Sequence, residues 1–403
     1  MTKVQMSETP LQYVARVRYG MGQPPTLADD GEVPIIRATN IQRGHITSPS
    51  LQRAHLRDLP LDRAPLLEAG EILVVRSGAY TGDSALITDE WAGSAPGYDL
   101  RVTPVSGLDP RFLSWCLLSR YCLDQLDLLK LRAAQPHLNA DELASVLVPL
   151  PSLEVQRRIA DHLDTETARI NHATGLNDLR ASLVEERLTA ELEELIDGPA
   201  VPLGYRIQRL EQGTSPVADA SPASAGEAGV LKLSAVDRGT FRPSENKALM
   251  TLVGEGSLAR ARKGSVLISR ANTPERVGDA AYVDGLAGIR LLFPDLMFQL
   301  QVDERRCDAR YISMALRTRR VRHQIESTAR GSSQSMVKLR QSDVRELRLP
   351  LPDRSTQASV ATKFEDRRLE ARELLDALER STSLLLERRQ ALITAAVTGE
   401  IEV

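Results

Sequence analysis

Two stretches of this chain, VLVPLPSLEVQRRIADHLD (146–164) and LRLPLPDRSTQASVATKFED (347–366), read as copies of one sequence. In each, a Pro-Leu-Pro tripeptide is followed by a glutamine and a long run of mixed charged and apolar residues. The match continues without a gap to Gly198 in the first copy and Gly399 in the second. A match of this length within one chain indicates an internal duplication.

Shorter matches upstream extend the duplication to the rest of the chain. GDSALI (82–87) matches GDAAYV (278–283), and each follows an apolar run of strand length. A repeat of roughly 200 residues is too long for a solenoid and predicts two copies of a module followed by a helix. We therefore expect an α+β fold with an internal pseudo-twofold repeat, divided into a globular mixed α/β module (1–148), a connector helix (149–198), a second module (199–348) and a second connector helix (349–403).

The two connector segments have the features of long amphipathic helices. Proline is excluded from helix interiors, so each Pro-Leu-Pro run ends a module in an extended segment. Each predicted helix of about 40 residues is roughly 60 Å long, and its apolar stripe needs a partner. Antiparallel pairing as a coiled coil is favoured over packing of each helix on its own module. In the first copy the stripe is assigned to Leu163, Ile170, Ala173, Leu176, Leu179, Leu183, Leu188, Leu192 and Leu195, with a slip near Gly175. In the second copy it is assigned to Ala371, Leu374, Leu378, Leu385 and Leu392.

Length and composition limit the class of protein. The 403 residues exceed a single core, and 42% hydrophobic with 26% charged residues is ordinary for a globular chain. No apolar run is long enough to cross a membrane, and the first residues lack the apolar stretch of a secretory signal, so a cytoplasmic protein without membrane contact is expected. Three scattered cysteines are too few for a disulfide framework or a cysteine zinc site.

Charge is distributed unevenly along the chain. The net charge is −3, but the second module carries an excess of basic residues and both connector helices are acidic. Much of the basic excess lies between Arg305 and Arg348. Clustered arginines occur on solvated helix faces and on surfaces that bind nucleic acid, and charge alone leaves both interpretations open.

No catalytic signature is found in the sequence. It lacks a Walker phosphate-binding loop, a Gly-x-Ser-x-Gly elbow and a His-Glu-x-x-His motif, and its six histidines fall at no metal-ligand spacing. We therefore predict no catalytic residues and no metal site, and we favour a binding protein over an enzyme. A nuclease with an unrecognised active site is the enzymatic alternative.

The junction between each module and its helix resembles a known family. In specificity subunits of type I restriction–modification systems, a Gln-x-x-Leu segment leads to a Pro-Leu-Pro helix start that carries a glutamine. Here Gln135, Pro149 and Gln156 occupy these positions in the first copy. The second copy is similar from Gln334 onward but has Thr356 where an acidic residue is usual.

The resemblance covers the order module, helix, module, helix, and it implies a function. In that family the subunit has no catalytic activity, and each module is a target-recognition domain that reads one half of a split, asymmetric site in double-stranded DNA. The paired helices set the spacing and dock two methyltransferase subunits, which carry S-adenosylmethionine, so no cofactor is expected in this chain. Two restriction subunits join to complete the nuclease. A stand-alone DNA-binding or scaffold protein with coiled-coil spacers is the alternative.

Candidate DNA contacts are assigned to turn-rich segments of the modules, because acidic helices repel phosphate. Arg, Lys, Asn and Gln side chains carry the donor patterns that read base edges. The candidates are Arg37, Asn40, Arg43, Arg76, Tyr80, Arg132 and Gln135 in the first module, and Lys232, Arg238, Arg270, Arg276, Arg330, Gln334 and Lys338 in the second.

Some apolar residues of the connector lie off the assigned stripe, namely Val184, Leu375, Leu384 and Leu386. Exposed apolar side chains at several points along a connector favour a docking surface, which the resemblance assigns to the methyltransferase subunits. The alternative is that these residues widen the seam between the helices.

Overall fold

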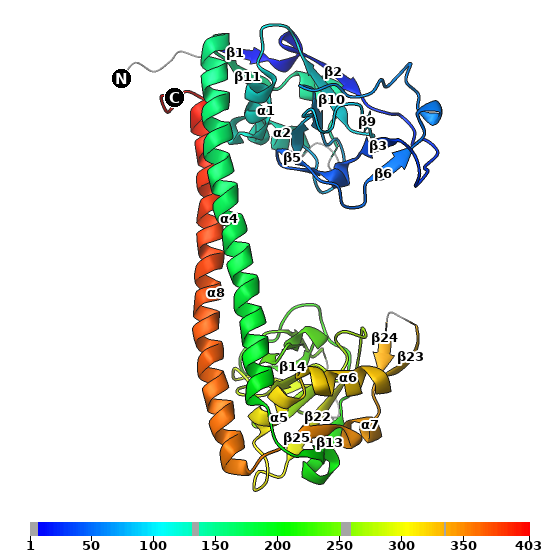
Figure 1. Cartoon of the computed structure of the whole chain (residues 1–403), viewed down its shortest axis with the longest axis vertical. Helices are drawn as coiled ribbons and strands as arrows, with labels where there is room; N and C mark the ends of the chain where they lie inside the picture. The colour runs from blue at the N-terminus through cyan, green and yellow to red at the C-terminus, as the bar shows by residue number, and fades with distance from the viewer. Residues whose placement is uncertain (1–6, 131–136, 251–258, 334–335) are drawn as a thin grey trace. The chain divides into compact units, whose positions relative to one another are not determined.

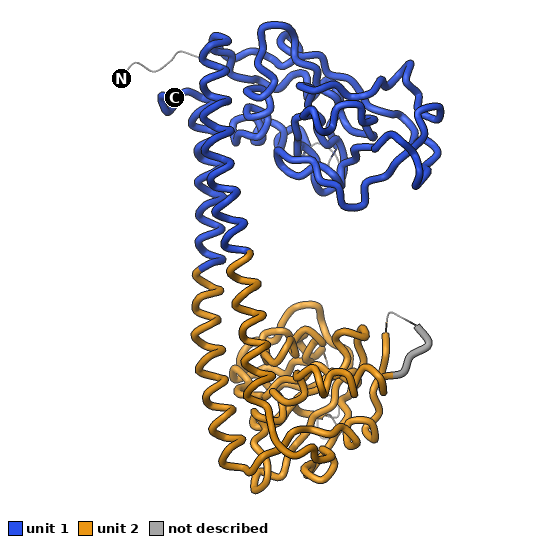
Figure 2. Tube along the Cα trace, in the orientation of Figure 1, with its two compact units in different colours: residues 1–178, 378–403 blue, residues 179–377 orange. Residues whose placement is uncertain are grey.

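The computed structural model of the chain describes residues 7–130, 137–250, 259–333 and 336–403 (Figure 1). It forms two compact units: unit 1 comprises residues 1–178 and 378–403, and unit 2 comprises residues 179–377 (Figure 2). The long helices α4 (Leu153–Leu195) and α8 (Arg354–Val397) each run from one unit into the other. Each unit therefore holds one module together with the adjoining parts of both helices.

The module of unit 1 is built from short strands and short helices. In chain order they are β1 (Ser7–Pro10), η1 (Leu11–Tyr13), β2 (Ala15–Tyr19), β3 (Val33–Ile36), η2 (Ala38–Asn40), β4 (Ile41–Gln42), β5 (His45–Ile46), β6 (Gln52–Ala54), η3 (Leu56–Asp58), β7 (Ile72–Val74), β8 (Ser84–Leu86), β9 (Ala95–Pro96), β10 (Leu100–Pro104), α1 (Pro110–Leu118), α2 (Arg120–Lys130), α3 (Ala140–Ala144) and β11 (Leu147–Leu150). The main sheet has the antiparallel order β2-β10-β7-β8, and a smaller sheet has the order β6-β3-β9.

The module of unit 2 repeats these elements. They are β12 (Ala200–Pro202), η4 (Leu203–Arg206), β13 (Ile207–Gln212), β14 (Ala228–Leu231), η5 (Leu233–Ala235), β15 (Val236–Asp237), β16 (Thr240–Phe241), β17 (Asn246–Ala248), β18 (Val266–Ser269), β19 (Ala271–Asn272), β20 (Ala280–Tyr282), β21 (Arg290–Leu292), β22 (Met297–Val302), α5 (Ala309–Ala315), α6 (Arg319–Thr328), β23 (Arg330–Ser333), β24 (Met336–Lys338), α7 (Gln341–Glu346) and β25 (Arg348–Pro350). The sheets β13-β22-β18-β20 and β17-β14-β21 have the same order and strand directions as their counterparts in unit 1. The predicted duplication is therefore present at the level of topology.

The glutamine of the repeated motif ties each module to its helix. Gln156 is 2% exposed; its side-chain carbonyl accepts from the Asp109 backbone N–H at 2.9 Å, and its amide donates to the Pro151 carbonyl at 2.9 Å. Gln357 makes the same pair of bonds, with Asp308 at 3.0 Å and Pro352 at 2.8 Å. A buried amide must satisfy both its donor and its acceptor, so the motif positions a helix start and has no need of a ligand.

Both long helices contribute to the core of each unit. In unit 1, Ile159 and Leu163 of α4 and Ile393 of α8 are buried with the main sheet and α1. In unit 2, Leu192 of α4 and Phe364 of α8 are buried in the equivalent way. The helices thus pair with each other, as predicted, while their ends also pack on the modules (Figure 1).

The seam between the helices differs from the predicted stripe. Leu179 and Leu183 are 55% and 53% exposed and Leu374 is 49% exposed, whereas Val184 and Leu375 are half-buried. The assignment to Leu179, Leu183 and Leu374, and the placement of Val184 and Leu375 outside the seam, were therefore wrong. The stripe was counted from apolar residues alone, so it passed over Asn177, which is 7% exposed and faces Ser381 and Thr382 of α8.

Buried positions recur every seven residues without the predicted slip at Gly175. Ile170 is 6% exposed and Asn177 is 7% exposed, and Val184 continues the series on the same face. Asn177 donates to the hydroxyls of Ser381 and Thr382, each at 3.2 Å. A buried amide with partners on the facing helix fixes the register of a helix pair, because a shift would leave it unsatisfied.

The remaining expectations concern smaller features. The three cysteines are buried and unpaired thiols. Within the described residues, no helix combines the length and the apolarity that crossing a membrane requires.

Candidate nucleic-acid interface

Arg76 lies just beyond the C-terminal end of the central strand β7, between two aromatic rings. Its guanidinium carbon is 4.7 Å from the centroid of the Tyr19 ring and 4.3 Å from that of Tyr98. Its Nη2 is 3.0 Å from Nε2 of His137. Tyr19 and Tyr98 are 47% and 51% exposed, so the cluster is at the surface. A guanidinium stacked between rings keeps its planar fork in one orientation, which suits bidentate recognition.

Sheet register explains how these residues meet. Leu100 of β10 is opposite Tyr19 on one side and Val74 on the other, so continuing the antiparallel ladder brings Tyr98 beside Arg76. The residues are far apart in sequence, and neither tyrosine was among the sequence candidates. Only the strand pairing could have identified them.

Arg270 occupies the equivalent position in unit 2. It directly follows β18, and the pair Ile268–Phe298 corresponds to Val74–Leu100 of unit 1. The Arg270 guanidinium is 5.8 Å from the Phe298 ring centroid, and its Nη1 donates to the Asp295 carbonyl at 3.4 Å. By register, Gln212 replaces Tyr19 and Leu296 replaces Tyr98.

A second basic residue lies beside each of these arginines. His137 forms a bridge with Ser77 in unit 1, and Lys338 pairs with Ala271 in unit 2, which is the same position of the repeat. Lys338 is exposed. Both modules therefore place an arginine and a second nitrogen-bearing side chain at one strand end, with different side chains around them.

The other candidates of the first module have different surroundings. Asn40 is fully buried, and its amide donates to the carbonyls of Thr47 and Pro49, both at 3.1 Å, so in this structure it holds a loop. Arg37 donates to the Ser50 carbonyl at 2.8 Å. Arg43 is paired with Asp83 at 3.1 Å and is largely exposed, and Tyr80 is 56% exposed.

In the second module, several candidates are ion-paired. Lys232 is 3.7 Å from a carboxylate oxygen of Glu245. Arg276 contacts two carboxylates, Asp237 at 2.7 Å and Asp279 at 2.9 Å. Arg238 is exposed at a hairpin tip.

Four candidates fall wholly or partly beyond what the structure describes. Arg132, Gln135 and Gln334 lie outside the described residues. For Arg330, only the backbone is described, opposite Lys338 in β23. DNA contact by any residue of the candidate set remains a prediction.

A buried carboxyl lies behind Arg76. Asp99 is 3% exposed, and its Oδ1 accepts from the Arg76 backbone N–H at 3.1 Å. Burial raises the pKa of Asp99 to about 6, although this hydrogen bond and the charge of Arg76 act in the opposite direction. Folding therefore favours the protonated form of Asp99.

Replacing Asp99 by asparagine is expected to stabilise the protein at pH 7 and to remove part of its pH dependence. Protonated Asp99 adds to the free energy of unfolding. This contribution is complete below the ordinary pKa of 3.8 and is lost as the pH rises through about 6. Asparagine keeps the acceptor without the charge, so the gain at pH 7 is about 1–3 kcal/mol. Denaturant unfolding of both proteins from pH 4 to pH 7 measures the difference. A variant that is less stable than the parent at pH 7 would contradict the assignment.

Residues 22–179 match the family described as the type I restriction modification DNA specificity domain. The specificity subunit of the type I restriction enzyme EcoEI from Escherichia coli is 26% identical over 196 residues, which are 48% of this chain and 33% of that subunit. The match thus spans about a third of the curated relative.

Two solved structures share the fold over nearly the whole chain. One chain, from a study of complex assembly and conformational transition in the type I R-M system, superposes with a TM-score of 0.72 at 18% identity and 98% coverage of both chains. The HsdS subunit from Thermoanaerobacter tengcongensis gives a TM-score of 0.51 at 18% identity, with 98% of this chain and 97% of that chain covered.

A duplicated module-and-helix chain of this kind has the fold of a type I specificity subunit. Residues 22–179 belong to the type I restriction modification DNA specificity domain family. The resemblance drawn from the two Pro-Leu-Pro junctions is therefore confirmed.

Proposed function

We propose that this chain is the non-catalytic DNA-recognition subunit of a type I restriction–modification system, and that each module reads one half of a bipartite, asymmetric site. The observation that carries the proposal is the equivalence of Arg76 and Arg270. Both follow the central strand of the main sheet, and their neighbours differ. Two modules with one fold and different side chains around a shared arginine suit two different half-sites.

The test uses the chain together with its expected partner. The chain is co-expressed with a candidate type I methyltransferase subunit from the same genome, and methylated bases in the host DNA are mapped by sequencing. We expect adenine methylation within a split motif of two unlike halves. Methylation of a continuous or palindromic motif would contradict two-module reading. Metal-dependent cleavage of DNA by the isolated chain would favour the nuclease alternative.

We further propose that the connector helices dock two methyltransferase subunits, which supply S-adenosylmethionine, and that two restriction subunits join the complete nuclease. Leu183 of α4 and Leu384 of α8 occupy the same position of the repeat, and they are 53% and 64% exposed. Leu386 is also 51% exposed. Exposed leucines at equivalent positions suit two copies of one partner, each bound to one unit.

Replacing Leu183 or Leu384 by glutamate is expected to remove one methyltransferase subunit from the co-purified complex. A charge at the centre of an apolar contact must be desolvated without a partner, which opposes binding. The mass of the complex measures the loss, and the double variant should lose both subunits. Leu128→Glu is the matched control, because Leu128 is 68% exposed and belongs to α2, which is not part of the connector. An unchanged mass in the double variant would remove these residues from the docking surface.

A further inference from the structure

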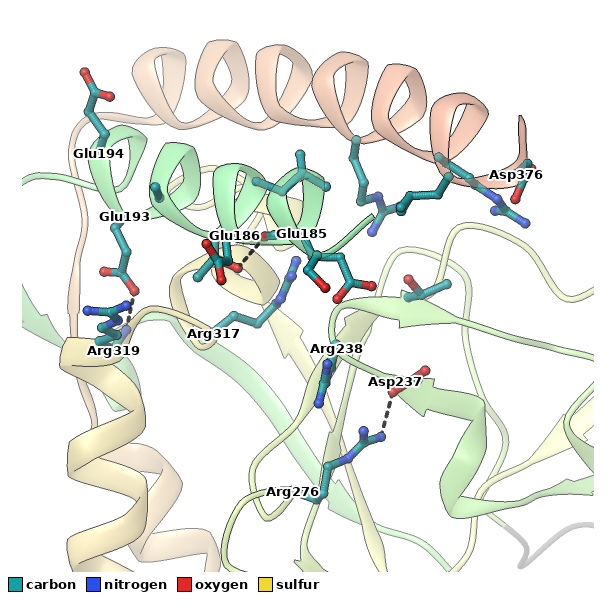
Figure 3. Close-up of a pocket in the computed structure, with 18 of the residues that line it drawn as sticks. Glu185, Glu186, Glu193, Glu194, Asp237, Arg238, Arg276, Arg317, Arg319 and Asp376 are labelled. Atoms are coloured by element: carbon teal, nitrogen blue, oxygen red, sulfur yellow. Dashed lines mark hydrogen bonds and ion pairs between the residues drawn. The ribbon is translucent and has the colours of Figure 1, made fainter. Parts of the chain in front are cut away.

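Unit 2 contains a groove between its module and the two long helices. The groove has a volume of ≈ 1660 Å³ and is lined by α4, α8, the β15–β16 hairpin and the segment before α6. Three of its arginines, Arg238, Arg317 and Arg368, come from three different elements and influence one another electrostatically. In Figure 3, Arg317 lies beside α4 near Glu185 and Glu186, and Arg238 lies on the neighbouring hairpin.

Arg317 is the most enclosed of the three arginines. Its guanidinium carbon is 6.0 Å from the Phe364 ring centroid, and a Cβ on Gly239 would be 2.4 Å from its Nη1. Burial, together with the charges of Arg368 and Arg238, lowers the pKa of Arg317 to about 10, while Asp279 acts in the opposite direction. A charge that is removed from water and placed beside like charges is costly unless a counter-charge is present.

Two carboxylates of the module, Asp279 and Asp237, are engaged by other arginines, while Glu185 and Glu186 of α4 line the same groove without an ion pair to Arg317. Asp279 is bound by Arg276 at 2.9 Å, and Asp237 is bound by Arg276 and Arg242 at 2.7 and 2.9 Å. Among the described residues, no carboxylate lies within 4 Å of the guanidinium groups of Arg238, Arg317 or Arg368. Arg368 instead donates to the backbone carbonyl of Gly239 at 2.8 Å.

Within the described residues, the arginine of the equivalent hairpin in unit 1 has a carboxylate partner, unlike Arg238, Arg317 and Arg368 of the unit 2 groove. Arg43 corresponds to Arg238, and it is neutralised by Asp83 at 3.1 Å. Asp279 is the counterpart of Asp83, but in unit 2 it is engaged by Arg276. The counterpart of Arg368 in α4 is Thr167, a buried neutral residue that donates to the Leu163 carbonyl at 2.5 Å. The grouping of arginines without a carboxylate in direct contact is therefore specific to unit 2.

We propose that Arg238, Arg317 and Arg368 form a binding site for a phosphate-type oxyanion. Guanidinium groups match the oxygens of phosphate by charge and by hydrogen-bond geometry. A bound oxyanion would place a negative charge in direct contact with these guanidinium groups, which no described carboxylate within 4 Å does. The oxyanion is either a free phosphate or a phosphate of the DNA backbone, and the site itself does not depend on the sequence-reading role of the modules.

The test measures thermal unfolding of the full chain in sodium phosphate and in sodium chloride at equal pH and ionic strength. General salt effects act on every variant alike, so the phosphate-specific rise in Tm is the quantity of interest. Arg317→Gln and Arg368→Gln are expected to lose this rise, with phosphate binding weakened about tenfold or more. Arg43→Gln, the matched change in unit 1, should retain it. An equal rise in the parent, Arg317→Gln and Arg368→Gln would overturn the proposal.

Non-specific duplex DNA distinguishes the two sources. If the site takes a backbone phosphate, Arg317→Gln and Arg368→Gln each reduce the salt dependence of duplex binding by about one phosphate. If it takes a free phosphate, the salt dependence is unchanged while the Tm effect is lost. A chain that fails to bind DNA but keeps the phosphate-specific rise would contradict the proposed function and leave the oxyanion site supported.

Discussion

Replacing Arg76 by alanine is expected to relax recognition of one half-site and to leave the other half-site unchanged. The loss of a bidentate base contact costs about 1–3 kcal/mol, or roughly ten- to a hundredfold in discrimination against the wrong base. The stacking of Arg76 between Tyr19 and Tyr98 holds the fork in place, which makes this the largest single-residue effect that we expect. Binding to duplexes that carry every single-base change in each half-site measures it.

Two matched variants test which half-site Arg76 reads and whether its contact is with a base. Arg270→Ala should alter only the other half-site, because Arg270 is the counterpart of Arg76 in unit 2. Arg76→Lys keeps the charge but loses the planar fork, so it should restore affinity without restoring discrimination. A uniform weakening over all sequences would show that Arg76 contacts phosphate and does not read a base.

Insertion of one heptad into each long helix is expected to change the spacer of the recognised site and to preserve both half-site sequences. The insertions are placed after residue 177 in α4 and after residue 380 in α8, so that Asn177 still faces Ser381 and Thr382. Seven helical residues add about 10 Å, which corresponds to about three base pairs of duplex. Mapping of methylated sites measures the spacer.

A heptad inserted into α4 alone is the control for this experiment. Placed after residue 177, it shifts the rest of α4 by one heptad against α8, so the two helices no longer pair in register in unit 2, and stability should fall instead of the spacer changing. Full binding with an unchanged spacer in the double insertion would contradict the idea that the connector sets the spacing.

The repeat made the module topology predictable from the sequence. The residues that lie in the seam between α4 and α8 could be identified only from the structure. Pro149 and Pro350 marked the module ends because proline restricts the backbone locally, and both lie in the strands β11 and β25. The seam depends on which residues fit between two helices, and Asn177 lies there while Leu179 is exposed. Hydrophobicity ranks leucine above asparagine, but it does not describe the partners that a buried amide finds on a facing helix.

The candidate site was predictable only in part, for a similar reason. Arg76 and Arg270 could be chosen because each follows an apolar strand in the matching part of the repeat. Tyr19, Tyr98 and His137 join Arg76 through strand pairing between distant segments, and no local pattern encodes that register. Asn40 had a suitable side chain for base reading, but loop carbonyls take up its amide.

The sharing of core residues between distant segments also determines the order in which the units can form during synthesis. Ile393, Ala396 and Val397 are buried in the core of unit 1, together with Ile72 and Phe112. The ribosome makes residues 179–377, which constitute unit 2, before it reaches them. Domains generally fold in the order of their synthesis, but here unit 1 is begun first and completed second. Until the end of α8 has been made, unit 1 exposes the apolar surface that α8 covers in the folded protein.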